Sequence, residues 1–281
     1  MKLIHAVIIS LATFGMAVTA EAESTSEVRR SLTQVTDDIY RFDNNFHVSI
    51  VVVTDDGVVV GDPINREAAE WLKAEIEKRF QQPVKYLVMS HSHADHASDG
   101  EIFEDTATVI THEKFVPHLE AGEVRTAEPD VTFSDDYSFE LGGKTFTLTY
   151  LGVGHGDDLI AMTVQPDNVA FIVDVVSPRR LPWRELPTNT ISGGINQIKV
   201  AESLEFDVLI PGHSYTGTKQ DVTDMRLYLE RLRDKVQTEL DAGKSKEEIV
   251  ATVRMPEYAH WDYYDEWIEL NVAGMVRLLT Q

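Results

Sequence analysis

The chain has 281 residues and is strongly acidic, with 47 Asp and Glu against 25 Lys and Arg and a formal net charge of -22. Such a charge repels phosphate backbones and anionic lipid surfaces, so it argues against a nucleic-acid partner. The sequence contains no cysteine, which excludes disulfides, thiolate metal ligands and cysteine nucleophiles. Any bound metal must therefore be held by imidazole and carboxylate groups, which suit zinc, iron or manganese.

Residues 1–22 have the pattern of an export signal. Lys2 supplies the positive start, residues 3–18 are almost wholly apolar, and Ala20-Glu21-Ala22 provides small residues around a cleavage point. The alternative is an uncleaved membrane anchor, but the apolar stretch is short for a bilayer span of about 20 residues. We therefore expect cleavage near Ala20 to Ala22. The mature protein is then periplasmic or secreted and has no stable membrane anchor.

The first half of the mature chain predicts a mixture of strands and helices. Residues 23–34 are polar and are expected to form a loose lead-in. Residues 46–62 predict a β-hairpin that turns at 55–57. A helix follows up to Phe80, with Asn65 as its cap and Ala68, Leu72 and Ile76 on one face. Apolar stretches at 84–90 and 107–111 predict two further strands, and a short helix follows the second.

The second half predicts two more hairpins and then a helical end. Strands on either side of Gly142-Gly143 and of residues 166–168 form the hairpins, and residues 206–213 form a further buried strand. Helices are expected from about 220, with a capping box from Ser245 to Glu248 and a last helix over 262–279. Because hairpins are mixed with helices, the sheets cannot be wholly parallel. We expect one domain over 23–281, helical from about 220 to 281.

The most specific chemical signal is the segment His91-Ser92-His93-Ala94-Asp95-His96, which directly follows an apolar strand. Loops at strand ends carry function because the sheet behind them is rigid. His91 and His93 are two apart in extended chain, so they point the same way and can share one ion. Asp95 and His96 lie past the bend and can serve a second ion nearby. A solvated loop with chance histidines is the alternative interpretation.

Three weaker signals occur at other strand ends. His155 lies in the glycine-rich stretch 152–156, and glycines let the backbone bend close to an ion. His213 follows Pro211-Gly212, and Asp174 closes the apolar strand at 169–173. Each signal alone is also compatible with an ordinary turn or, for Asp174, a helix cap. Four strand ends that each offer ligand atoms are much more specific together.

The order His-x-His-x-Asp-His, Gly-His, Asp, Pro-Gly-His resembles the metallo-β-lactamase superfamily, from the hairpin at 46 through His213. The resemblance implies an α/β (α+β) fold, a four-layer αββα sandwich of two mixed sheets flanked by helices. It also implies that one metal is held by His91, His93 and His155 and the other by Asp95, His96 and His213, with Asp174 bridging as in glyoxalase II and related lactonases. An alternative alignment puts Ser177 at the ligand position and leaves Asp174 behind the metals.

A pair of divalent ions, Zn²⁺ in first place with iron or manganese as alternatives, would make hydroxide from a bridging water at neutral pH. Asp95 could orient this hydroxide or carry a proton. The expected function is hydrolysis of an ester, thioester, lactone, lactam or phosphoester, with β-lactamase activity as one candidate. Exported zinc metallohydrolases are also similar to this chain.

Two other functions remain open at this stage. One is an oxidoreductase that resembles persulfide dioxygenases, which use a single iron held by two histidines and an acid. The other is a non-catalytic accessory protein that keeps a metal site. The expected partner is a small-molecule substrate, and the sequence does not indicate an oligomeric state.

Candidate substrate-binding residues are few. Arg179, with Arg180 beside it, could meet an anionic group, Tyr215 could donate to an oxyanion, and His47 could lie over the metals or simply at a hairpin edge. The aromatic residues at 261–267 are expected to pack the last helix onto the core, with a pocket wall as the second interpretation.

Overall fold

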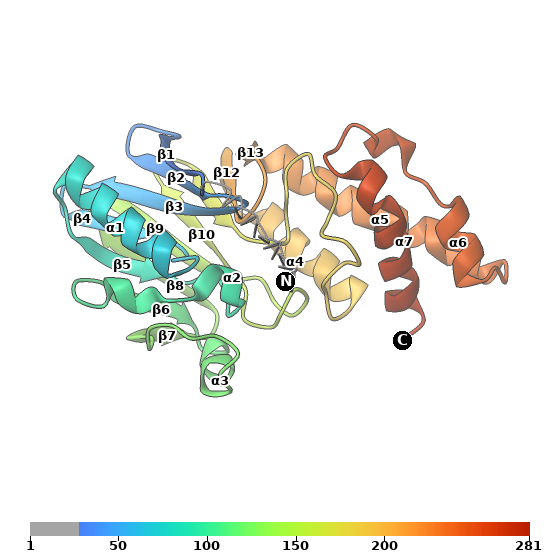
Figure 1. The fold of residues 1–281 in the computed structure, drawn as a ribbon, viewed down its shortest axis with the longest axis horizontal. Helices are drawn as coiled ribbons and strands as arrows, with labels where there is room; N and C mark the ends of the chain where they lie inside the picture. The colour runs from blue at the N-terminus through green and yellow to red at the C-terminus, as the bar shows by residue number, and fades with distance from the viewer. Residues whose placement is uncertain (1–27) are drawn as a thin grey trace, which may run out of the picture.

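The computed structural model describes residues 28–281, which form two mixed β-sheets with helices on their outer faces (Figure 1). The first sheet runs in the order β1 to β7, and the second in the order β13-β12-β11-β10-β9-β8. The expected four-layer arrangement of two mixed sheets flanked by helices is confirmed. The expected signal segment, residues 1–22, lies outside the described residues. No helix within 28–281 combines the length and apolar character needed to cross a bilayer.

The first sheet is antiparallel from β1 to β4 and parallel from β4 to β7. The bounds of its strands are β1 Arg30–Gln34, β2 Ile39–Asn44, β3 His47–Thr54, β4 Gly57–Val60, β5 Val84–Val88, β6 Thr108–His112 and β7 Val131–Phe133. The predicted hairpin at 46–62 is β3 and β4. The lead-in expected at 23–34 is wrong for its last residues, because the whole of β1 pairs with residues 40–44 of β2. Only Leu32 of β1 is buried, so this edge strand carries little apolar pattern.

Successive residues of β4 face opposite sides of the first sheet, as the pleat of a strand requires. Val58 and Val60 pack under helix α1 (Arg66–Phe80), while Val59 faces the second sheet. Asn65 caps α1 as predicted, because its side chain accepts a hydrogen bond from the backbone N–H of Ala68 at 3.1 Å. The short helix α2 (Ala94–Ala97) and helix α3 (Phe115–Glu120) also belong to this half of the molecule, as does the 3₁₀ turn η1 (Gly100–Phe103).

The second sheet holds both remaining predicted hairpins. Its strands are β8 Asp136–Leu141, β9 Lys144–Tyr150, β10 Ile160–Gln165, β11 Val169–Ile172, β12 Val208–Pro211 and β13 Gly217–Thr218. Only β11 and β12 run parallel, and between them the chain leaves the sheet to form helix α4 (Ile191–Ser203). The strands expected at 159–173 and 206–213 therefore end at neighbouring points of one sheet edge.

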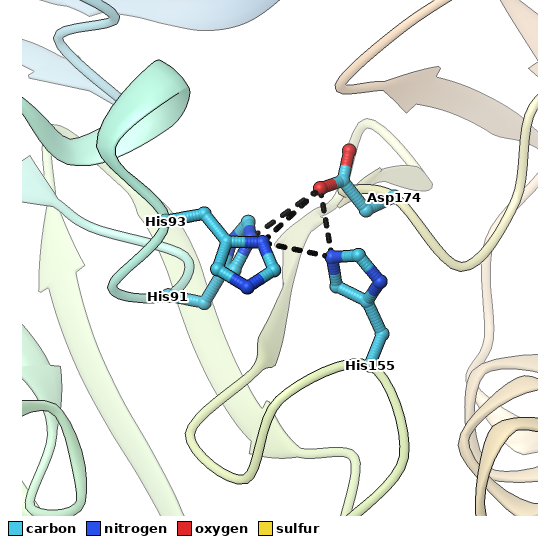
Figure 2. A group of neighbouring side chains, drawn as sticks. All are labelled: His91, His93, His155 and Asp174. Carbon is cyan, nitrogen blue, oxygen red and sulfur yellow. Dashed lines mark hydrogen bonds and ion pairs between the residues drawn. The ribbon is translucent and has the colours of Figure 1, made fainter. Parts of the chain in front are cut away.

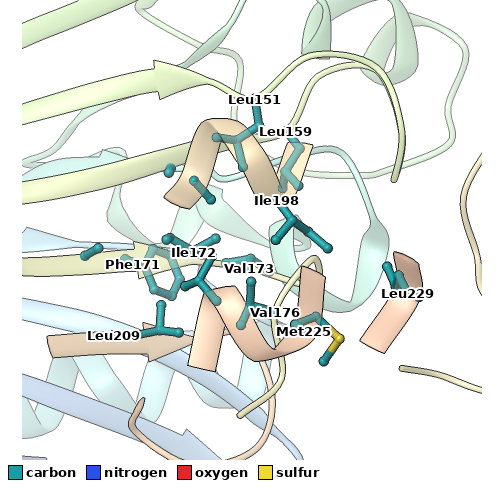
Figure 3. Packing of buried hydrophobic residues seen from close by; sticks show 14 of the residues in the cluster. Leu151, Leu159, Phe171, Ile172, Val173, Val176, Ile198, Leu209, Met225 and Leu229 are labelled. Carbon is teal, nitrogen blue, oxygen red and sulfur yellow. The ribbon is translucent and has the colours of Figure 1, made fainter. Parts of the chain in front are cut away.

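Helices cover the outer face of the second sheet and extend beyond it. Helix α5 (Lys219–Asp241) contacts α4, and α6 (Lys246–Thr252), the turn η2 (Pro256–Tyr258) and α7 (Tyr264–Leu279) complete the chain. Ile198 of α4 and Met225 and Leu229 of α5 belong to the same buried cluster as Val173 and Val176, which follow β11 (Figure 3). The helical end and the Ser245 to Glu248 capping box are present as predicted.

Candidate metal centre

A buried carboxylate, that of Asp62, holds the segment that carries His91 and His93 in place. Asp62, which is fully buried, accepts hydrogen bonds from the backbone N–H and the hydroxyl of Ser90, both at 2.7 Å. Since the Ser90 hydroxyl gives its proton to Asp62, it accepts from Nδ1 of His91 at 2.9 Å. The Nε2 atom of His91 then carries no proton, and its lone pair points into the site. Asp62 was missed in the sequence analysis.

The turn that carries His155 is shaped by helix α4. Gln197 of α4 accepts a hydrogen bond from the backbone N–H of His155 at 2.6 Å and donates one to the carbonyl of Gly152 at 2.8 Å. A Cβ on Gly154 would lie 2.4 Å from the Gln197 side chain, so only glycine permits this close approach. Nδ1 of His155 lies 2.8 Å from the carbonyl of Pro187 and must donate to it, because a carbonyl oxygen can only accept. In the neutral ring, Nε2 is then unprotonated and has a free lone pair.

Asp174 and His213 come from the ends of the neighbouring strands β11 and β12. Asp174 has φ +62, a left-handed conformation that Asp tolerates better than most residues. A Cβ on Gly212 would lie 2.4 Å from the Val173 side chain and 2.9 Å from the His96 ring, so glycine is required beside His213. Nδ1 of His213 donates to the carbonyl of Phe46 at 2.7 Å and leaves Nε2 free.

The two carboxylate oxygens of Asp174 face two different groups of histidines. Oδ2 lies 3.3 Å from His91 Nε2, 3.9 Å from His93 Nδ1 and 3.0 Å from His155 Nε2 (Figure 2). Oδ1 lies 3.2 Å from Nε2 of both His96 and His213. Figure 2 shows the first group and Asp174 converging from three separate segments of the chain. The structure thus brings together six of the predicted ligands.

The unpaired atoms of this cluster fit metal ions. Nε2 of His91 and Oδ1 of Asp174 are buried and have no hydrogen-bond partner. His93 Nδ1 faces His155 Nε2 at 3.0 Å, and His96 Nε2 faces His213 Nε2 at 3.1 Å. At these distances the two nitrogens of each pair can bind the same cation. In a tetrahedral zinc site with bonds of about 2.0–2.1 Å, ligand atoms lie about 3.3 Å apart, close to the distances seen here.

The outer nitrogens of the imidazoles are bound in the manner typical of metal ligands. His155 and His213 donate Nδ1–H to backbone carbonyls, and His91 donates to a hydroxyl that is itself fixed by Asp62. Nδ1 of His96 lies 3.5 Å from Oδ2 of Asp62. Such partners fix the tautomer and the ring orientation of a ligand before metal binds. The residue types and their arrangement therefore fit a divalent-metal centre.

The pKa shifts of the clustered side chains favour the binding of cations. Burial opposes ionisation of Asp174, but the charge of His96 and the close contacts with the imidazoles of His155, His213 and His91 outweigh it and hold the pKa of this carboxyl well below its usual range. Burial likewise opposes protonation of His96, and Asp174 and Asp62 outweigh it and raise the pKa of His96. Burial lowers the pKa of His91. A carboxylate in the anionic form therefore lies at the centre of the site.

Asp95 and His47 form the outer edge of the site. Asp95 Oδ2 lies 3.3 Å from His47 Nε2, 3.7 Å from His96 Nε2 and 3.8 Å from His213 Nε2. Burial favours a raised pKa for Asp95, but the hydrogen bond from His47 and the charge of His96 outweigh it and lower that pKa below its usual range. His47 begins β3, at the edge of the hairpin, and its ring lies 5.0 Å from that of His213, centre to centre.

A cavity of about 740 Å³ opens beside the cluster. His47, His93, Asp95, Asp174 and others of the cluster line one side of it. The other side is formed by α4, α5 and α7, together with the segment that precedes α4. Its residues include Arg180, Trp183, Ile191, Ile198, Met225, Leu229, Tyr263 and Trp267.

Two of the predicted substrate-binding residues lie elsewhere. The Tyr215 hydroxyl donates to Asp262 at 2.7 Å, and the Arg179 guanidinium lies 4.5 Å from the centre of the Tyr215 ring. Neither lines the cavity, whereas Arg180 does. The aromatic residues at 261–267 divide between both interpretations. Trp261 packs in the core, and Trp267 forms part of the cavity wall.

A further group, His118, Asp157 and Asp158, has ligand atoms within reach of one another. Its atoms already have protein partners. His118 bonds to Asp157 and Glu123, both at 2.7 Å, and Asp158 accepts from the backbone N–H of Ser92 at 2.8 Å. This group ties helix α3 and the His91 segment to the His155 turn.

The comparisons with known proteins agree with this site. A family model described as the metallo-beta-lactamase superfamily matches residues 43–213. This is more than half of the chain, and the chain belongs to that superfamily. The fold is the one used by the metal-dependent hydrolases of this class. All of the predicted metal ligands lie inside the matched segment.

Individual relatives are distant. The chain is 30% identical over 122 residues to a metallo-beta-lactamase type 2 from Elizabethkingia meningoseptica, and it spans 49% of the length of that relative. A metallo-beta-lactamase from Pontibacter korlensis superimposes with a TM-score of 0.65 at 20% identity, over 72% of this chain and 99% of that one. The sec-alkylsulfatase Pisa1 of a Pseudomonas species gives 0.70 at 15%, over 88% and 49%. At these identities the two structures show the fold alone.

Proposed function

We propose that this protein is an exported hydrolase that binds two divalent cations, Zn²⁺ in first place, and cleaves an ester, thioester, lactone, lactam or phosphoester. The observation that carries the proposal is the position of Asp174, which turns one carboxylate oxygen to each of two histidine groups. A single carboxylate shared in this way is typical of a two-metal site. The signal-like pattern of residues 1–22 supports export, with cleavage near Ala20 to Ala22 and a periplasmic or extracellular location.

His91, His93 and His155 would hold one cation, His96 and His213 the other, and Asp174 would bridge them. Asp95 would complete the second group from the side of the cavity. When bound, such a pair of cations polarises the bond to be cleaved and acidifies a water molecule that attacks it. The protein supplies the fixed imidazole orientations and a cavity that removes bulk water from the substrate.

Asp95 is the chain's own candidate for proton transfer. Its Oδ2 faces the cavity and is hydrogen-bonded to His47 at 3.3 Å. Because its pKa is held below the usual range of a carboxyl, Asp95 is an acceptor at neutral pH. It can take a proton from the attacking water and release it to the leaving group, while His47 orients it.

Metal content and turnover test the proposal together. The purified protein would be stripped with a chelator, reloaded with Zn²⁺ and assayed on nitrocefin, a lactone, a thioester, a phosphodiester and, given the sulfatase fold neighbour, a secondary alkyl sulfate. We expect two ions per chain and metal-dependent hydrolysis of at least one substrate. His93→Ala should abolish it, whereas His260→Ala, a change at an exposed position outside the cavity, should not.

Two results would contradict the proposal. One iron per chain with oxygen uptake on a persulfide would identify an oxidoreductase of the dioxygenase kind. Full metal loading without turnover of any of these substrates would favour a non-catalytic accessory protein.

A further inference from the structure

The cavity beside the metal centre has two chemically different sides. Metal-centre side chains line one side, and apolar side chains of α4, α5 and α7 line the other. Ile198, Met225 and Leu229 are buried members of the core cluster that also reach this wall (Figure 3). Helices α5 and α7 lie beyond residue 213, so their part of the wall comes from outside the segment that matches the family model, whereas α4 lies inside it. A volume of about 740 Å³ is ample for a ligand with a sizeable apolar body.

One cationic side chain lies within this apolar wall. Arg180 lies over the rings of Trp267 and Tyr263, with its guanidinium carbon 5.1 Å and 5.9 Å from the two ring centres. Within residues 28–281 it forms no ion pair shorter than 4.0 Å, and its Nε atom is buried without an acceptor. Burial lowers the pKa of Arg180, although Tyr263, Asp174 and Asp262 act against this.

The other charged residues on this wall lie at its exposed margin. Arg184 and Glu266 also line the cavity, but both side chains are exposed to solvent. Neither forms an ion pair with Arg180. Stacking on aromatic rings holds a guanidinium in place and leaves its N–H groups free to bind a planar anion. Arg180 is therefore a fixed cation with no carboxylate within ion-pair distance among residues 28–281.

We propose that the cavity binds an amphiphilic anion, in which a carboxylate, sulfonate or sulfate group pairs with Arg180 and a hydrocarbon body lies against α4, α5 and α7. This rests on the proposed function, because it names the substrate class for the same centre. An anion satisfies the unpaired guanidinium, whereas a neutral ligand of the same shape leaves it buried and unpaired. The apolar wall adds affinity for each buried CH₂ group.

Binding of probes that cannot be hydrolysed tests the proposal without any turnover. Trp183 and Trp267 line the cavity, so tryptophan fluorescence of the full chain reports on its occupancy. Butane-, octane- and dodecanesulfonate, octanoate and 1-octanol would be titrated into metal-free protein below their micelle concentrations. We expect affinity to rise about three- to fourfold per CH₂ until the wall is covered. Octanesulfonate and octanoate should each bind at least tenfold more tightly than octanol.

Substitutions of Arg180 and Arg179 test which arginine binds the anionic group of the ligand. Arg180→Gln should weaken octanesulfonate binding about ten- to a hundredfold and leave octanol binding unchanged, and Arg180→Lys should weaken it less. Arg179→Gln is the matched control, because the neighbouring arginine lies on Tyr215 outside the cavity. Near-ultraviolet circular dichroism and the thermal midpoint would establish that each variant is folded.

Several results would overturn the proposal. They are equal binding of octanol and octanesulfonate, no dependence on chain length, or equal losses in the Arg180 and Arg179 variants. Probe binding that follows these expectations in a protein without hydrolytic activity would leave the binding site standing and reject the proposed function alone.

Discussion

Gln197 lies on helix α4, behind the His155 turn, and its side chain accepts a 2.6 Å hydrogen bond from the backbone N–H of His155. The same amide donates to the carbonyl of Gly152, so one buried side chain fixes both ends of the His155 turn. The direction of a metal-ligating imidazole is therefore decided by a residue that cannot itself contact the metal.

Gln197→Leu keeps the volume of this side chain and removes both hydrogen bonds. We expect zinc affinity to fall about 10- to 100-fold, because the His155 ring loses its fixed direction. Competition with a chromogenic chelator measures this. Gln237→Leu is the matched control, because Gln237 bonds only to Asp241 on the exposed face of α5. Unchanged zinc affinity in Gln197→Leu would show that the turn holds its shape without it.

Asp174 is shared between the two histidine groups, and this predicts a pattern of metal stoichiometry. His213→Ala removes a ligand from one group only, so we expect one of two ions to be lost on dialysis. Asp174→Ala removes an atom from both groups and should weaken both ions. Elemental analysis after dialysis against a chelator distinguishes the two. If His213→Ala retained both ions as tightly as the unaltered protein, the assignment of His213 to the second group would be wrong.

Asp62 follows β4, is fully buried and supports the His91 segment through Ser90, which follows the neighbouring strand β5. In Asp62→Ala the backbone N–H and hydroxyl of Ser90 lose their acceptor, and we expect a loss of about 2–3 kcal/mol in the free energy of unfolding. Denaturant unfolding of metal-free protein measures this apart from any effect on metal. Asp207→Ala, an exposed position, is the control and should change stability by less than about 0.5 kcal/mol.

The Glu202–Arg226 pair joins α4 to α5 and predicts a pH-dependent contribution to stability. The hydrogen bond from Arg226 at 2.6 Å outweighs burial and lowers the pKa of Glu202 below 4.5. A lowered folded-state pKa means that the contribution is present above the unfolded value and lost as pH falls through the folded one.

Glu202→Gln should therefore destabilise the protein by about 0.5–1 kcal/mol at neutral pH. The difference should shrink as pH falls below 4.5. Urea unfolding at several pH values measures it. Glu205→Gln, whose side chain is 93% exposed, should show no such dependence. A difference that grows with falling pH would contradict the sign.

The sequence was most informative where ligand atoms follow apolar strands. The His91 to His96 cluster, His155, Asp174 and His213 each end a strand with a clear apolar pattern, so their convergence could be predicted before the structure. Helix α4 could not, because Gly193 and Gly194 break its helical pattern near the start. Gly193 is needed there, since a Cβ would lie 2.5 Å from the carbonyl of Val153 in the His155 turn. The residue that weakens the helical signal is thus the one that brings the helix to the site.

Supporting residues were harder to predict than ligands. Asp62 follows β4 in a stretch that looks like any strand end, and only the fold shows that Ser90 lies above it. Arg179 and Arg180 are adjacent and equivalent in the sequence. Their side chains diverge because the chain at Arg179 has a positive φ, so one stacks on Tyr215 and the other reaches Trp267.

The wall formed by α5 and α7 begins only after His213, the last of the metal-centre residues in the chain. The metal centre and the part of the wall formed by α5 and α7 are thus encoded in consecutive stretches of the polypeptide. One recombination event after His213 would exchange the second and keep the first. Arg180 would remain with the reactive half but would lose the rings of Tyr263 and Trp267, so such a chimera would keep the head-group site only if the new stretch supplied aromatic rings in their place.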